Sequence, residues 1–266
     1  MTAVDYHGQT TLITGASAGL GAEFARQLAA RGSDLVLVAR RRDRLEALAG
    51  ELRDRHRVRV HVLAVDLAEA DPGQRLVRQV DQLGLHVTSV INNAGFGTFG
   101  LFHEADPARM RQEIAVDVTA VADISRAFIE RLRTAGRGVL VNVASMAAYQ
   151  PNPRMALYGA TKAFVLSLTE ALWEESRGTG LRVLALSPGA TRTEFFEVVG
   201  TDRAAGGTRL AAPVDVVRAA LAALDRRNPP PSVIAGRMNR VMASLARLAP
   251  RRQVIRAVGR MTAAGA

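Results

Sequence analysis

Short apolar runs alternate with amphipathic segments along almost the whole chain. The runs are rich in Val, Leu and Ile, as in strands buried on both faces, and they predict strands at 10–14, 35–39, 58–65, 87–91, 138–143, 181–186 and 232–235. The segments between them space their apolar residues as helices do, which predicts helices at 19–31, 42–55, 72–83, 107–134, 158–177 and 214–225. Strands and helices in this order form a parallel sheet covered on both faces, so we expect a doubly wound α/β domain.

The end of the chain differs from the rest. Seven of the ten excess positive charges are arginines at 237–260, a stretch without an acidic residue. Apolar residues follow helical spacing there, and Pro250 divides the stretch in two. We therefore predict one domain at 1–236 and a basic amphipathic helical extension at 237–266. Such a helix can lie on an anionic membrane surface, but its apolar face is modest, which favours packing on the domain or a subunit contact.

The composition excludes several classes of protein. The chain has no cysteine, so it has no disulfide, thiolate nucleophile or cysteine-ligated metal, and we expect no metal site. No run of about 18 apolar residues is present, and the first residues lack the features of a secretory signal, so we expect a cytoplasmic protein. Aromatic residues make up 5% of the chain and the positive charge is concentrated at one end, which argues against a nucleic acid as partner.

A glycine-rich segment, Thr14 to Gly21, lies between the first predicted strand and the first predicted helix. Glycines at 15, 19 and 21 let the chain turn sharply and bring its backbone close to a pyrophosphate. The N-terminus of the helix then offers free N–H groups and a partial positive charge to the anion. A tight strand-to-helix turn without a ligand would also use glycines, so this segment indicates a nucleotide site only together with the other motifs of the chain.

The end of the second predicted strand indicates which nucleotide binds. A carboxylate there usually holds the 2′-hydroxyl of NAD, but this chain has Ala39, followed by Arg40 and Arg41. A guanidinium binds a 2′-phosphate that a carboxylate would repel. The sequence therefore favours NADP(H), with Arg40 and next Arg41 as phosphate ligands, although some of these arginines would also solvate the next helix.

A serine, a tyrosine and a lysine form the predicted reaction centre. Tyr158 and Lys162 are four residues apart at the start of a helix, so their side chains share one face. A nearby ammonium favours the phenolate and lowers the pKa of a tyrosine, which suits a proton donor or acceptor. Ser145 follows the fifth predicted strand, where its hydroxyl can bond a substrate oxygen and stabilise a developing alkoxide.

The order of these motifs resembles that of the short-chain dehydrogenase/reductase family over about Gly8 to Ala235. The resemblance is carried by the glycine segment, by Asn-Asn-Ala-Gly at 92–95, by Ser145 and by Tyr-x3-Lys at 158–162. It implies a Rossmann-like fold and an oxidoreductase that transfers hydride between NADP(H) and a carbonyl or alcohol carbon, with tyrosine as acid and base. We expect reduction, and the family implies a homo-oligomer, a dimer or tetramer. The alternative is a sensor that binds NADP(H) without turnover.

The resemblance also assigns residues to the cofactor. It implies contacts with the adenine side from Asp66 and Leu67, although Asp66 could instead cap the residues that follow it. The remaining cofactor residues that it implies, beside Arg40, Arg41, Tyr158 and Lys162, are Gly15, Ser17, Ala18, Gly19, Leu20, Gly21, Asn93, Ala94, Gly95, Pro188, Gly189, Thr191 and Thr193.

One position departs from the family pattern. The family has an asparagine in the helix after the fourth strand, where it helps to hold a water linked to the lysine, and this chain has Asp117. A carboxylate beside Lys162 would stabilise the ammonium and alter the proton relay, unless the exchange is neutral. The resemblance also implies a substrate lid at about 193–212, where apolar residues lie between glycines. An apolar or aromatic carbonyl substrate is expected from the predicted pocket walls, which are Phe96, Phe99, Met146, Tyr149, Pro151, Met155, Phe195 and Phe196.

Overall fold

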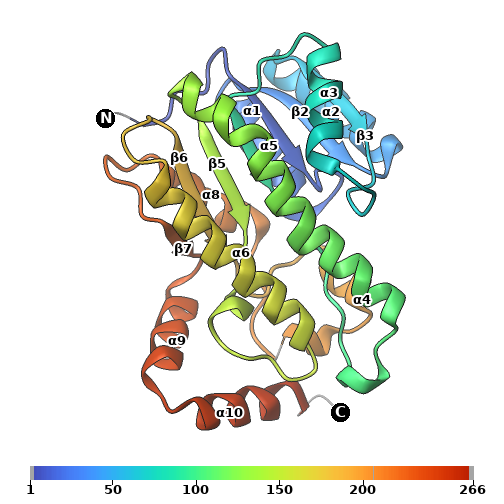
Figure 1. The fold of residues 1–266 in the computed structure, drawn as a ribbon, viewed down its shortest axis with the longest axis vertical. Helices are drawn as coiled ribbons and strands as arrows, with labels where there is room; N and C mark the ends of the chain where they lie inside the picture. Colours follow the sequence, from blue (N-terminus) through green and yellow to red (C-terminus); the bar gives the residue numbers. More distant parts are fainter. Residues whose placement is uncertain (1–2, 206, 264–266) are drawn as a thin grey trace.

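The computed structural model describes residues 3–205 and 207–263 (Figure 1). These residues form a seven-stranded parallel sheet in the order β3-β2-β1-β4-β5-β6-β7. The strands are β1 (Thr10–Thr14), β2 (Asp34–Ala39), β3 (Val60–Ala64), β4 (Ser89–Asn92), β5 (Val139–Val143), β6 (Arg182–Ser187) and β7 (Ser232–Ile234). The predicted lid includes Gly206, and the predicted domain and extension include residues 1–2 and 264–266, all of which lie outside the described residues.

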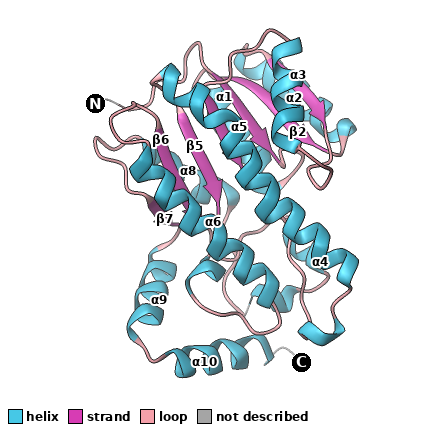
Figure 2. Ribbon diagram, viewed as in Figure 1, coloured by secondary structure: helices cyan, strands magenta, loops and turns pink. Residues whose placement is uncertain are grey.

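Helices cover both faces of the sheet (Figure 2). One layer consists of α1 (Gly19–Ala30), α2 (Arg42–His56) and α8 (Pro213–Leu224), which share an apolar core with one face of the strands. The other layer consists of α3 (Pro72–Gln82), α5 (Ala120–Ala135) and α6 (Ala156–Glu175), while α4 (Pro107–Ile114) extends beyond the sheet in line with α5. The central strands are fully buried because both faces are covered, which explains their nearly continuous apolar sequence.

The long helix predicted at 107–134 is present, but it changes character in the middle. A π-helical segment, Ala115–Thr119, joins α4 to α5 without interrupting the helix. A π segment adds a residue to the turn and is frequent at functional sites. It contains Asp117, whose side chain points into the protein and is fully buried.

The loops after β1, β4, β5 and β6 meet at the carboxyl edge of the sheet. The strand order reverses between β1 and β4, and open α/β sheets bind ligands in the crevice at such a switch point. The loop after β6 contains α7 (Phe195–Val199) and a 3-10 turn at Asp202–Ala205, both within the predicted lid. A further 3-10 turn, Phe102–Glu104, follows β4, and another, Met146–Tyr149, follows β5.

The C-terminal extension packs across this edge. Its helices are α9 (Arg237–Leu248) and α10 (Arg251–Ala263), and Pro250 separates them as the sequence predicts. Figure 1 shows both helices, drawn in red, beyond the carboxyl ends of β5 and β6. Contacts join α9 to β7 and α10 to the 3-10 turn of the lid. Packing on the domain is one of the arrangements that the sequence favoured; a subunit contact and a membrane contact stay predictions.

The doubly wound fold predicted from the sequence is confirmed. Each predicted strand and helix is present, and apart from the π segment at Ala115–Thr119 these elements differ from the prediction only at their ends; the third strand, for example, is Val60–Ala64 instead of 58–65. Such ends depend on hydrogen bonds to neighbouring strands, which one segment of sequence does not encode. None of the described helices is long and apolar enough to cross a membrane.

Candidate active site

The turn between β1 and α1 is packed so closely that its glycine positions 15 and 21 leave no room for a Cβ atom. Gly15 has a φ angle of +67°, and a Cβ on Gly21 would lie 2.3 Å from the carbonyl oxygen of Gly15. Helix α1 begins at Gly19, and its N-cap residue Ala18 makes no side-chain hydrogen bond to the helix. The N–H groups at this helix end are therefore available to an anionic ligand such as a phosphate.

The segment after β4 packs against this turn. The Thr14 hydroxyl accepts hydrogen bonds from the N–H groups of Asn93 at 3.0 Å and Ala94 at 3.1 Å. The Asn93 side-chain amide donates to the Thr14 carbonyl oxygen at 3.0 Å. These bonds fix the glycine turn at the switch point. The sequence placed Asn93, Ala94 and Gly95 beside the cofactor but did not reveal this contact with Thr14.

The two arginines after β2 differ in their contacts. The Arg41 guanidinium donates to the Ser17 hydroxyl at 3.0 Å and pairs with Glu194 at 2.9 Å, and Arg44 also pairs with Glu194. Arg40 is exposed, lines the same cavity, and has no hydrogen bond or ion pair among the described residues. Arg40 is thus the guanidinium still available to bind a phosphate, whereas Arg41 connects the glycine turn to the lid.

Asp66 follows β3 and adopts the capping geometry that the sequence left open. Its Oδ1 accepts a hydrogen bond from the Ala68 N–H at 3.0 Å. Asp66 and Leu67 also line the cavity beside the glycine turn. Capping and contact with a ligand are therefore compatible at this residue.

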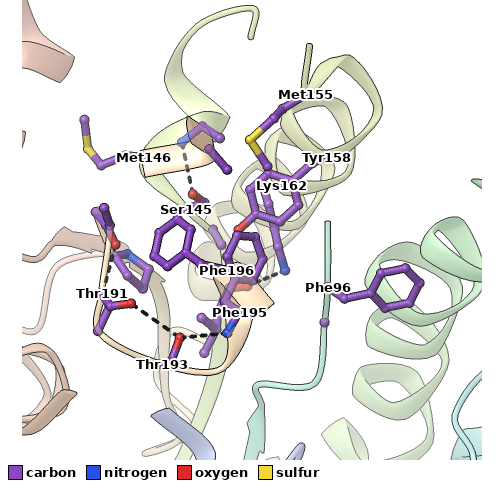
Figure 3. Close-up of a pocket in the computed structure, with 18 of the residues that line it drawn as sticks. Phe96, Ser145, Met146, Met155, Tyr158, Lys162, Thr191, Thr193, Phe195 and Phe196 are labelled. Atoms are coloured by element: carbon purple, nitrogen blue, oxygen red, sulfur yellow. Dashed lines mark hydrogen bonds between the residues drawn. The ribbon is translucent and has the colours of Figure 1, made fainter. Parts of the chain in front are cut away.

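Ser145, Tyr158 and Lys162 meet at the carboxyl end of β5 (Figure 3). Ser145 is the N-cap of the 3-10 turn after β5, where its hydroxyl accepts a hydrogen bond from the Ala147 N–H at 3.1 Å. Lys162 Nζ lies 5.6 Å from the centre of the Tyr158 ring and donates to the Val143 carbonyl oxygen at 3.2 Å. Two adjacent elements thus bring a hydroxyl, a phenol and an ammonium together.

The pKa of Tyr158 differs from the sequence prediction. Burial raises this pKa above its ordinary value, and the ammonium of Lys162 and the hydroxyl of Ser145 oppose the rise without cancelling it. The buried carboxyls of Asp117 and Glu113 add to the rise. The prediction of a lowered pKa was wrong for the protein alone, because it counted the ammonium but neither the burial nor the carboxyls.

Asp117 lies directly behind Lys162. Its Oδ2 is 3.0 Å from Lys162 Nζ, and its Oδ1 accepts a hydrogen bond from the Phe96 N–H at 3.0 Å. Burial lowers the pKa of Lys162, but the carboxylate of Asp117 and the nearby Tyr158 outweigh it and hold that pKa above its ordinary value. Gly95 leaves room for this pair, since a Cβ there would lie 2.9 Å from Lys162 Nζ.

The loop after β6 closes the site from the other side. The Thr193 hydroxyl accepts a hydrogen bond from the Phe195 N–H at 3.3 Å, and a Cβ on Gly19 would lie 3.1 Å from Thr193. The Thr191 hydroxyl donates to the Gly189 carbonyl oxygen at 2.9 Å. The loop after β6 is therefore in contact with the glycine turn.

One cavity of about 860 Å³ joins these parts. It is lined by Ser145 and by all the predicted cofactor residues except Gly21, including Leu20, Pro188 and Gly189. Gly21 and Asp117 are buried behind its wall, against Gly15 and Lys162 respectively. The chain thus places the uncapped start of α1 and the side chains of Ser145, Tyr158 and Lys162 in a single cavity.

Comparison with known families agrees with this geometry. The family model described as short chain dehydrogenase matches residues 9–204, which is well over half of the chain. The chain belongs to the short-chain dehydrogenase family. It is an oxidoreductase, as the family resemblance implied.

Individual relatives cover most of this dehydrogenase. It is 38% identical to a sulfoacetaldehyde reductase of Chromohalobacter salexigens over 73% of this chain and 77% of the relative. A short-chain dehydrogenase from Sphingobium yanoikuyae in complex with NADPH shares 36% identity, with a TM-score of 0.78 over 90% of this chain and 94% of that one. A 7beta-hydroxysteroid dehydrogenase shares 27% identity, with a TM-score of 0.85 over 97% of this chain and 100% of that one.

Five of the eight predicted pocket walls line the cavity, namely Phe96, Met146, Met155, Phe195 and Phe196. Figure 3 shows Tyr158, Phe195 and Phe196 close together, whereas the Phe96 ring points away from them. The Arg109 guanidinium stacks on that ring, 4.0 Å from its centre. The lid therefore supplies the aromatic rings nearest to the phenol.

The other three predicted walls were wrong. The Tyr149 hydroxyl hydrogen bonds with that of Ser187 at 3.3 Å while the rest of the side chain packs into a small core cluster. Phe99 lines a separate cavity of about 320 Å³. Pro151 lines neither cavity. These residues lie next to the motifs in the sequence, but that position does not determine in which direction a loop side chain points.

The sequence missed the contribution of the C-terminal extension to the site. The cavity is also lined by a set of mostly apolar residues from α9, α10 and the link between them: Asn239, Met242, Leu245, Ala246, Ala249, Gln253, Val254, Ala257, Val258, Met261 and Thr262. Their helical spacing was visible, but the surface that they would cover was not. The α4 residues Arg109 and Gln112 were missed as well.

Proposed function

We propose that this dehydrogenase reduces a bulky, apolar ketone or aldehyde to the alcohol with NADPH, and that Ser145, Tyr158 and Lys162 are its catalytic residues. The observation that carries the proposal is the single cavity in which these three side chains and the glycine turn meet. A cofactor bound at the turn and a substrate bound at Tyr158 would share that space. Hydride transfer requires such proximity of its two partners.

The residues present fit NADP(H). The uncapped start of α1 suits the pyrophosphate, and the glycine turn excludes side chains from the approach. Arg40, with Arg41 beside it, would hold the 2′-phosphate, and no acidic residue stands at Ala39 to repel it. The relative from Sphingobium was solved with NADPH, which supports the same choice.

The chain's own residues would manage the proton. The bound nicotinamide supplies the hydride. The Ser145 hydroxyl holds the substrate oxygen beside Tyr158, and the Tyr158 O–H gives its proton to that oxygen as the alkoxide forms. The Lys162 ammonium stabilises the phenolate that remains. Phe195 and Phe196 of the lid exclude water from the site.

The walls of the cavity indicate the substrate class. Apolar side chains enter from the lid and from both extension helices, with Met242, Leu245 and Val258 among them. Such walls suit a large hydrophobic carbonyl compound better than a small polar one. A steroid dehydrogenase is one structural relative that spans 97% of this chain, which agrees with a bulky substrate. The sulfoacetaldehyde reductase relative makes a small anionic aldehyde the contrasting case, and Arg109 is one of the cations that line the cavity.

The proposal is tested by following NADPH oxidation by absorbance with a panel of carbonyl compounds. The panel contains polycyclic and aromatic ketones, aliphatic aldehydes and a small sulfonated aldehyde. Reduction of the bulky ketones with the highest kcat/KM supports the proposal. Preference for the sulfonated aldehyde contradicts the apolar substrate class, and tight NADPH binding without turnover across the panel contradicts the enzyme and favours a sensor.

The choice of cofactor makes a separate prediction. Arg40→Asp should raise the KM for NADPH by about ten- to a hundredfold, the effect of losing one or two charge-assisted hydrogen bonds, and leave the KM for NADH almost unchanged. Arg42→Asp is the matched control, because Arg42 carries the same charge two residues away but lies outside the cavity. Equal effects of Arg40→Asp on the two cofactors would overturn this assignment.

A further inference from the structure

A second buried carboxyl lies close to the reaction centre. Glu113 is fully buried, at the end of α4 and one helical turn before Asp117. The Thr98 hydroxyl donates a hydrogen bond to its Oε2 at 2.7 Å. Among the described residues, Oε1 has no hydrogen-bond partner. A fully ionised carboxylate with one neutral donor would be poorly compensated at such a place.

The buried charges around Glu113 do not balance if every group is ionised, because the other nearby cation, Arg109, is partly exposed. Asp117 and Lys162 already form a buried ion pair at 3.0 Å. Burial raises the pKa of Glu113 to about 7; the Thr98 hydrogen bond opposes the rise, Asp117 adds to it, and Arg109 and Lys162 oppose it. One ammonium thus faces two buried carboxyls that lie four residues apart on one continuous helix, and interacting like charges favour a single shared proton.

We propose that Glu113 and Asp117 hold one proton between them beside Lys162, and that this proton replaces the one that Tyr158 gives to its substrate. The first half concerns the protein alone, and the second half rests on the proposed function. Glu113 is then a positioning residue, which acts through Asp117 and Lys162 without touching the substrate. The proposal also accounts for the aspartate at position 117, where the family has an asparagine, because a side-chain amide could not hold or release the shared proton.

The proton balance of this route is simple. In reduction the Tyr158 O–H bond breaks and its proton goes to the substrate oxygen, which leaves a phenolate. A proton then moves from the Lys162 ammonium to the phenolate, and the carboxyl pair returns a proton to the Lys162 amine. The pair is left with two carboxylates and takes a proton from water. Thr98, which is partly exposed and bonded to Glu113, marks the side from which that water can approach.

The shared proton can be observed without turnover. Lys162 is the only lysine of the chain, so isotope labelling at Nζ gives a single ammonium signal in a nuclear magnetic resonance spectrum. In the cofactor-free wild-type protein we expect this signal to shift with a midpoint near pH 7, where Glu113 ionises. In Glu113→Gln the shift should vanish. The exposed Glu130 on α5 gives the matched control, Glu130→Gln, which should keep it.

Two further variants separate the proton from a structural role. Thr98→Val removes a hydrogen bond that lowers the pKa of Glu113, so the midpoint should move to higher pH. Asp117→Asn removes a like charge that raises this pKa, so the midpoint should move to lower pH. A purely structural Glu113 would change the melting temperature in these variants without moving any midpoint.

Kinetics test the second half of the proposal. The wild-type kcat for reduction should fall as pH rises through about 7, because the carboxyl pair loses its proton, and kcat for alcohol oxidation should rise. Glu113→Gln should lose this inflection and reduce about tenfold more slowly below it, equivalent to one pKa unit at the proton donor. A wild-type signal that does not titrate near pH 7 overturns the shared proton. A titrating signal with an unchanged kinetic profile in Glu113→Gln overturns the return of the proton to Tyr158, and a protein that reduces no carbonyl contradicts the proposed function itself.

Discussion

Replacing Tyr158 with phenylalanine should lower kcat for carbonyl reduction by about a hundred- to ten-thousandfold, the range that a positioned acid contributes. The variant loses only the O–H group. Its ring keeps the contact with Phe195, whose centroid lies 5.3 Å from that of Tyr158. The cavity should therefore keep its shape, and the affinity for NADPH should be nearly unchanged. A loss confined to kcat is the signature of an interaction made only in the transition state.

The measurement is a single-turnover reaction followed by NADPH absorbance, together with NADPH binding by fluorescence. Tyr149→Phe is the matched control, because it removes the same atom from a tyrosine that does not line the cavity. That control should retain most of its kcat, although it loses the hydrogen bond with Ser187. A Tyr158→Phe variant within tenfold of the wild type would mean that another group donates the proton.

The fold and most of the cofactor cleft could be predicted because their signals are local. A strand, a turn with Gly15 and Gly21, and a helix start lie within one short segment, and Gly15 adopts a positive φ angle that favours glycine. The position of Lys162 follows from Tyr158 by helix geometry alone. Asp117 was found by its place in the family pattern, and the structure adds the 3.0 Å contact that shows what the carboxylate does.

Other features depend on contacts between distant segments and were not visible in the sequence. The helical pattern of the extension was clear, but it did not show that Met242 and Val258 would line the cavity. Glu113 resembles any other acidic residue of a helix until its burial is known. The predicted direction of the Tyr158 pKa shift was wrong for the same reason. Burial depends on the folded structure, and its effect on this pKa outweighs that of the neighbouring Lys162 ammonium.

Replacing Lys162 with methionine should greatly lower kcat and also lower the free energy of unfolding. Apart from the proton proposed to be shared with Glu113, the variant leaves the buried carboxyl of Asp117 with the Phe96 N–H as its only hydrogen-bond partner among the described residues. Breaking one side of a buried ion pair costs about 3–5 kcal/mol of unfolding free energy. The loss of kcat should match that of Tyr158→Phe, since the phenolate would form without a cation beside it.

The loss of stability in Lys162→Met should depend on pH. Burial raises the pKa of Asp117, and the methionine removes the ammonium that opposes the rise. The folded variant then holds this proton more tightly than the unfolded chain, so its stability is highest in acid and falls as pH rises through the raised pKa. Denaturant unfolding at acidic and neutral pH should therefore show a smaller deficit from the wild type in acid. A deficit that is equal at both would mean that Asp117 is not the group left unpaired.

A second substitution separates stability from chemistry. Adding Asp117→Asn to Lys162→Met removes the unpaired carboxylate and should recover most of the lost stability, because replacing both partners of a buried pair is far less costly than removing one. Activity should not return. Lys162→Arg should likewise stay folded and inactive, since a guanidinium keeps the charge but does not release its proton. Lys162 is the only lysine among the 35 basic residues of the chain, so arginine meets every other need for positive charge. An active Lys162→Arg variant would show that the site needs the charge alone, with no proton passing through residue 162.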